Sequence, residues 1–217
     1  MSKANVRDRL KRWQFWLPLA LQLALILLIP LQASWIQTTG ERVVLQTAPV
    51  DPYDLFRGYY VTLSYDISRP QTLSELDGWD TFTAEQAARR GEFGPLPRQV
   101  PFYVTLEAPA EAQSQLPLPW QPVAISGDRP AQLSPDQVAL RGTVNPAFIS
   151  DTGGPWLYGL ERYYIPEAQR QEINDRIQAA QSVQPGEAGD FLVEISVNRR
   201  GEAVPIEMWI QGQVYRF

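Results

Sequence analysis

The chain contains no cysteine and no histidine among its 217 residues. It therefore cannot form disulfides, use a thiol nucleophile, build a histidine-based catalytic triad, or hold zinc or haem through these ligands. Lysine is nearly as scarce, because Lys3 and Lys11 are the only two and both lie at the N-terminus. The rest of the chain thus lacks a lysine for a Schiff base or a serine–lysine dyad.

Positive charge is also scarce outside the N-terminus. Residues 1–35 hold five basic residues and one acidic residue, which leaves 14 arginines and 23 acidic residues, a net charge of −9, for the remainder. Nucleic-acid binding depends on basic stripes that neutralise phosphates. So acidic a region argues against a nucleic-acid partner.

What the chain does contain is enough apolar material for a folded domain. Hydrophobic residues make up 44% and aromatic residues 11%, so the chain is neither disordered nor wholly embedded in a membrane. The 19 prolines are dispersed, which indicates many turns and short strands.

One long run has no charge at all, from Trp16 to Trp35, and it is rich in leucine. As a helix it would span about 30 Å, the hydrocarbon thickness of a bilayer. Trp13, Trp16 and Trp35 flank the run as an aromatic belt does, and the basic cluster before it predicts an N-terminus on the cytoplasmic side.

We therefore predict a single-pass protein of the cell (inner) membrane. Its parts are a cytoplasmic segment at 1–14, a transmembrane helix at 15–36 and an extracytoplasmic, periplasmic domain at 37–217. The absence of cysteine is compatible with an oxidising compartment. A cleaved signal peptide is the alternative, because Leu31-Gln32-Ala33 imitates a cleavage site. Leu31 is large for that site and the apolar run is long, so a retained anchor is favoured.

The stretch from Asp51 to Ile67 joins a turn to a strand. Residues 51–58 are turn-like, and from Tyr59 onward apolar and polar residues alternate, which predicts one half-buried strand. Gly58, Tyr60, Leu63 and Tyr65 resemble the signature of the GDYXXLXY family of membrane-anchored proteins, with Tyr59 where the family has aspartate. The segment 158–167 and the residues after it resemble the C-terminal part of the same family.

The remaining pattern predicts a mainly β fold, an antiparallel sheet domain with one packed helix (α+β), behind the single transmembrane helix. A short helix capped by Thr83 and stopped by Gly91 is expected at 83–90, and a longer helix from Glu167 onward. Gly142 is expected to allow a bulge. Strands are expected at 40–47, 59–67, 100–107, 120–126, 136–145, 157–166, 191–198 and 203–211, with the tail at 213–217 as a final edge.

The acidic residues near the two motifs are the candidates for chemistry. Two carboxylates about 5–9 Å apart could hydrolyse glycosidic bonds, which makes a hydrolase acting on envelope glycans the alternative function. Asp51 and Asp54 also suit turn capping, and Glu167 suits a helix N-terminus, so structural roles are favoured. No spacing matches an EF-hand loop, and no phosphate-binding loop or nucleophile elbow is present.

Arginine and tyrosine side chains near the same motifs are candidates for binding. Arg57 and Arg162 suit an anionic ligand, or pairing with Asp54 and Glu161. The motif tyrosines could stack against a sugar or peptide, although alternation assigns about half of them to the core. The candidate binding residues are Asp51, Asp54, Arg57, Gly58, Tyr60, Leu63, Tyr65, Glu161, Arg162, Tyr163 and Glu167.

Together these patterns favour a non-enzymatic binding or accessory protein of the cell envelope, with no cofactor and no metal. The family resemblance implies a companion of a multi-span membrane protein, so the expected partners are the lipid bilayer and such a protein.

Overall fold

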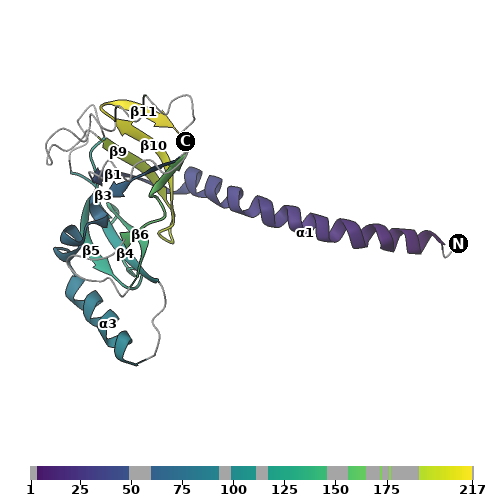
Figure 1. Ribbon diagram of the computed structural model, residues 1–217, viewed down its shortest axis with the longest axis horizontal. Helices are drawn as coiled ribbons and strands as arrows, with labels where there is room; N and C mark the ends of the chain where they lie inside the picture. The colour runs from purple at the N-terminus through teal and green to yellow at the C-terminus, as the bar shows by residue number, and fades with distance from the viewer. Residues whose placement is uncertain are drawn as a thin grey trace.

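The computed structural model describes residues 4–48, 60–92, 99–110, 117–145, 156–164, 172, 176 and 191–216. A single long helix, α1 (Ala4–Thr39), projects from a β-rich domain (Figure 1). Within it, Trp13–Thr39 has a mean hydropathy of 2.0 and is long and apolar enough to cross a membrane. The helix is continuous through Pro18 and Pro30 and runs past the predicted boundary at residue 36.

The domain is mainly β, as predicted, and all its strand pairs are antiparallel. A five-stranded sheet has the order β11-β10-β9-β1-β3, a four-stranded sheet the order β5-β4-β6-β7, and β2 pairs with β8. The strands predicted at 191–198 and 203–211 are confirmed and pair as a hairpin, and the predicted final edge strand follows them. The strands are β1 (Glu41–Ala48), β2 (Tyr60–Thr62), β3 (Ser64–Tyr65), β4 (Val100–Glu107), β5 (Gln121–Ser126), β6 (Gln137–Val144), β7 (Trp156–Leu157), β8 (Arg162–Tyr164), β9 (Phe191–Val197), β10 (Ala203–Ile210) and β11 (Gln213–Arg216).

The five-stranded sheet lies against the end of α1, and α3 (Trp79–Glu92) lies at the far end of the domain (Figure 1). Two backbone hydrogen bonds join the sheets, from Trp120 N to Val44 O (2.8 Å) and from Arg141 N to Gly201 O (2.9 Å). The hydrophobic core is continuous across both sheets, because buried residues from each belong to one cluster.

The prediction of one strand across 59–67 is wrong. The chain pairs with β8 at β2, leaves it at Leu63, pairs with β1 at β3, and then forms a 3-10 turn at Asp66–Ser68. The described part of the predicted apolar face is nevertheless confirmed, since Leu63, Tyr65 and Ile67 are all buried. Alternation identified which side chains face the core, whereas the change of pairing partner depends on distant strands.

The helix predicted at 83–90 is longer than expected. It begins at Trp79 and continues through Gly91 to Glu92, so Thr83 is not its cap. The Thr83 hydroxyl instead donates to the carbonyls of Trp79 and Asp80 inside the helix. Buried Trp79 and Phe82 hold the additional first turn against the core. A further short helix, α2 (Pro70–Ser74), precedes it.

The predicted bulge at Gly142 is also wrong, because Gly142 pairs in regular register with Phe102. A Cβ at Gly142 would lie 2.3 Å from the Phe102 ring. That ring cannot move aside easily, since it packs edge-on against Trp156 and Tyr158. Glycine therefore stands here to make room for the aromatic core. Of the helix predicted after Glu167, the described residues Glu172 and Arg176 are helical and form an ion pair.

Candidate functional site

The two motif segments, far apart in the sequence, lie side by side in the structure. Tyr60 pairs with Tyr164, Val61 with Tyr163 and Thr62 with Arg162. Where the β2–β8 pairing ends, Leu63 N donates to Glu161 O at 2.8 Å. We call the described parts of these segments, residues 60–65 and 158–164, the tyrosine clasp.

Buried tyrosine hydroxyl groups form hydrogen bonds that hold the clasp together. Tyr65 OH donates to Leu160 O at 2.8 Å and lies 2.7 Å from Tyr163 OH. Because the Tyr65 proton is engaged by Leu160, Tyr163 donates to Tyr65. Tyr158 OH donates to Ile67 O at 2.6 Å. Side chains from both segments therefore satisfy each other's buried polar groups.

A tight turn connects β7 to β8 and positions these tyrosines. Gly159 has a φ of +78°, a conformation that glycine adopts without strain. The half-buried Glu161 carboxylate accepts a hydrogen bond from Tyr158 N across the turn. Glu161 thus has a structural use in this turn.

The clasp keeps its phenols neutral. Burial raises the pKa of Tyr65 and of Tyr158 well above the ordinary value, and the nearby Glu161 carboxylate adds to the effect. Burial likewise raises the pKa of Tyr163. Phenols that ionise so reluctantly are poor bases and nucleophiles at neutral pH. These three tyrosines are buried, so they provide hydrogen bonds and packing rather than a stacking surface.

The clasp contains only some of the candidate binding residues predicted from the sequence. Leu63, Tyr65, Glu161, Arg162 and Tyr163 belong to it, and Tyr60 contributes its backbone pairing. The Arg162 side chain is exposed. In the described ranges no group of three or more acidic residues is arranged to hold a metal ion. The remaining candidates, Asp51, Asp54, Arg57, Gly58 and Glu167, lie outside the described residues.

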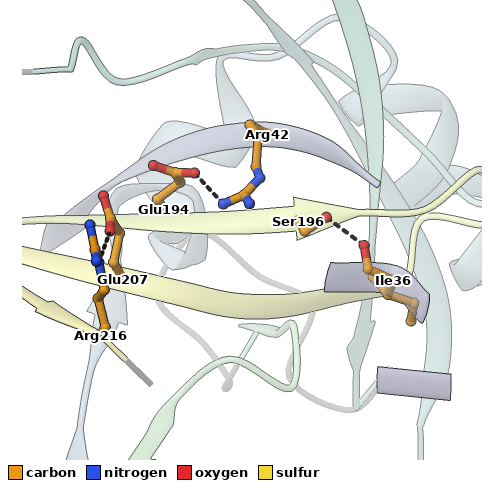
Figure 2. Close-up of polar contacts among 6 residues, drawn as sticks. All are labelled: Ile36, Arg42, Glu194, Ser196, Glu207 and Arg216. Atoms are coloured by element: carbon orange, nitrogen blue, oxygen red, sulfur yellow. Dashed lines mark hydrogen bonds and ion pairs between the residues drawn. The ribbon is translucent and has the colours of Figure 1, made fainter. Parts of the chain in front are cut away.

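A second feature, which sequence reasoning missed, is the junction between α1 and the sheet (Figure 2). Ile36, one turn before the helix ends, is buried, and its carbonyl accepts hydrogen bonds from Ser196 Oγ (2.6 Å) and Gly40 N (2.9 Å). Beside it, Arg42 of β1 forms an ion pair with Glu194 of β9 at 2.6 Å. Helix and sheet are therefore joined directly, without a flexible linker.

Gly40 makes this close approach feasible. A Cβ there would lie 2.3 Å from Ser196 Oγ and 2.8 Å from the carbonyl oxygens of Ile36 and Val197. The glycine after the helix is visible in the sequence, but its contact with Ser196, 156 residues away, is not.

We expect Gly40→Ala to loosen the junction, because backbone atoms must move to admit the methyl group. The loss of stability should be roughly 1–3 kcal/mol, the usual range for overpacking. The chain has no cysteine, so spin labels on Gln37→Cys and Gln213→Cys can report the distance between helix and sheet, which should broaden in the variant. Gly127→Ala is the matched control, since its added Cβ finds its nearest atom at 3.5 Å. An unchanged distance distribution in Gly40→Ala would contradict a rigid junction.

Comparison with known proteins identifies a family. A model of the GDYXXLXY protein family matches residues 22–208, which include most of the apolar helix and both segments of the clasp. No curated protein and no solved structure matches the chain.

Proposed function

The chain belongs to the GDYXXLXY family, and we propose that it is a non-enzymatic accessory subunit of another membrane protein. In this proposal α1 crosses the cell (inner) membrane once, with the N-terminus in the cytoplasm and the β domain on the extracytoplasmic, periplasmic side. The basic residues before the apolar run support this orientation.

The distribution of exposed apolar side chains carries the proposal. In the described part of the chain, every exposed large hydrophobic residue except Val214 belongs to α1. Protein interfaces have an apolar centre, and larger exposed apolar patches mark interaction sites. The described surface of the β domain offers no such patch, so the contact with a partner is assigned to the helix, within the membrane, where packing and interhelical hydrogen bonds drive association.

Gln22 indicates where that contact lies. Its side chain is exposed in the middle of the apolar helix and has no hydrogen-bond partner within the described residues. An amide in hydrocarbon gains from a bond to another helix. Ile29, about two turns further on, shares its face, as does Ile36 after about four turns. A partner helix bound at Gln22 would therefore lie on the side of α1 that contacts the β domain.

The rigid junction gives the proposal a mechanism. A partner helix that binds α1 is placed beneath a domain whose position on the helix is set by Ile36, Gly40 and Ser196. Binding in the membrane thereby determines where the domain stands relative to the partner's extracytoplasmic surface.

The test is recovery of a partner with the full-length protein, extracted from its native membrane in mild detergent and identified by mass spectrometry. Wild type should bring down one recurrent multi-span membrane protein. Gln22→Leu should reduce its recovery, with a three- to thirtyfold weaker affinity for loss of one interhelical hydrogen bond, roughly 0.6–2 kcal/mol.

Gln37→Leu is the control, because it makes the same chemical change outside the apolar run. Recovery of wild-type protein alone would contradict the accessory role. Equal losses for both variants would contradict the assignment to Gln22.

A further inference from the structure

The turn between β9 and β10 carries two exposed arginines at its tip, Arg199 and Arg200. Asn198 organises it: the Asn198 carboxamide oxygen accepts from Arg200 N (2.8 Å) and Glu202 N (3.0 Å), and Gly201 N donates to Asn198 O. Gly201 has a φ of +82°, which suits glycine. The loop is therefore held in one conformation while both guanidinium groups face solvent.

This turn lies beside the last turns of α1. Gln32 Nε2 of the helix donates to Glu202 Oε2 at 3.4 Å, and just before the turn Ser196 Oγ donates to Ile36 O. Trp35, between these two contacts, is 70% exposed. A tryptophan at the end of an apolar helix marks the level of the lipid headgroups. The turn thus stands at the level where α1 would leave the membrane.

Within the described residues, the positive charges of Arg199 and Arg200 are not taken up by ion pairs. Arg42, Arg69, Arg176 and Arg216 form the ion pairs of the described structure, whereas Arg199 and Arg200 form none. A third exposed arginine is adjacent, because Arg141 N donates to Gly201 O.

Two carboxylates lie near the turn, and neither forms an ion pair with Arg199 or Arg200 in the described structure. Glu202 accepts from the Asn198 and Gln32 side-chain amides through its Oε2 atom. Glu41 is opposite Val197 in the strand register, at the base of the turn rather than at its tip. In a region whose net charge is −9, the arginines of this turn are a local exception.

We propose that Arg199 and Arg200 bind the phosphate groups of membrane lipids in the leaflet from which α1 emerges. The proposal rests on the membrane placement given above, and it adds a lipid contact that is separate from the helix partner. A guanidinium group matches a phosphate with paired N–H donors. With the helix junction on one side and the arginine turn beside it, the domain is held to the bilayer at two points, which fixes its tilt.

The experiment titrates full-length protein in neutral detergent micelles with phosphatidylglycerol and measures lipid binding by native mass spectrometry. The double variant Arg199→Gln/Arg200→Gln should bind about tenfold to thirtyfold more weakly than wild type, because each arginine near an anionic surface contributes. Rising salt should shrink this difference. Arg199→Lys/Arg200→Lys should bind more tightly than the double glutamine variant but more weakly than wild type, since the charge is kept and the paired N–H donors are lost.

Arg129→Gln is the control, because Arg129 is exposed and lies two residues after Gly127, where an added Cβ would be 3.5 Å from Glu85 of α3 at the far end of the domain. Equal binding by wild type and the double glutamine variant would overturn the proposal, as would an equal loss in Arg129→Gln.

A carbonate wash of native membranes separates the membrane placement of α1 from the lipid contact of the arginines. Release of the protein defeats the membrane placement and this proposal together, while retention with unchanged lipid binding by the variants defeats only this one.

Discussion

Replacement of Tyr65 by alanine is expected to remove most of the stability of the β domain. Tyr65 is completely buried. Its hydroxyl, from the first clasp segment, forms hydrogen bonds with Leu160 O and Tyr163 OH of the second segment. Truncating a buried aromatic residue costs about 3–5 kcal/mol, and domains of this size are stable by about 5–15 kcal/mol. The variant should therefore unfold at much lower denaturant concentration, as measured by tryptophan fluorescence of the full-length protein in micelles.

Two variants separate the contributions to that loss. Tyr65→Phe keeps the ring but removes the hydroxyl that donates to Leu160 O and bonds to Tyr163 OH, and should cost about 1–3 kcal/mol. Tyr103→Ala removes a tyrosine that is only partly buried, and should cost less than Tyr65→Ala. A Tyr65→Ala protein as stable as Tyr103→Ala would show that the clasp does not hold the domain together.

Strong alkali is expected to unfold the domain through the same tyrosines. Tyr65, Tyr158 and Tyr163 have pKa values in the folded state above their ordinary value of 10.0. The stability from their protonated forms is fully present below pH 10. Above it, the unfolded chain releases these protons while the folded chain holds them, so stability falls as pH rises. With three tyrosines the slope approaches about 4 kcal/mol per pH unit.

The composition makes this pH dependence unusually easy to assign. After the N-terminal segment the chain has no histidine, cysteine or lysine, and arginine stays charged throughout the range. Denaturant midpoints should therefore be nearly constant from about pH 6 to 9 and fall only above about pH 10. Tyr65→Phe should reduce the alkaline slope by about a third. A decline that begins near neutral pH, or a slope unaffected by Tyr65→Phe, would contradict this origin.

Much of the architecture follows from local patterns. The apolar run predicts α1, and strand-forming residues bounded by turns predict β4, β6, β9 and β10. Thr83 and Gly142 show where local rules fail. A threonine before a polar helix resembles a cap, but burial of Trp79 and Phe82 moved the start of the helix. A glycine within a strand resembles a bulge, but here it accommodates the Phe102 ring.

In the candidate site, too, the sequence identifies individual segments but not how they meet. The signature residues Leu63 and Tyr65 and the segment around Tyr163 are recognisable in the sequence, yet nothing local to either segment states that they pair. Their pairing depends on hydrogen bonds across almost 100 residues, such as Tyr65 OH to Leu160 O. The turn arginines, Arg199 and Arg200, appear in the sequence only as part of a hairpin, and their position beside the end of α1 depends on the contact between Glu202 and Gln32.

The sequence by itself determined an apolar helix behind a basic segment, a mainly β domain, and the absence of histidine, cysteine and lysine chemistry from that domain. These properties follow from composition and periodicity, which depend only on each residue and its near neighbours. The tertiary structure alone decided that the two motif segments form a clasp, that Gly40 and Ser196 lock the helix to the sheet, and that a turn of arginines stands beside the helix end. Each of these depends on which distant segments meet, and that is settled by the packing of the whole core rather than by any one stretch of the chain.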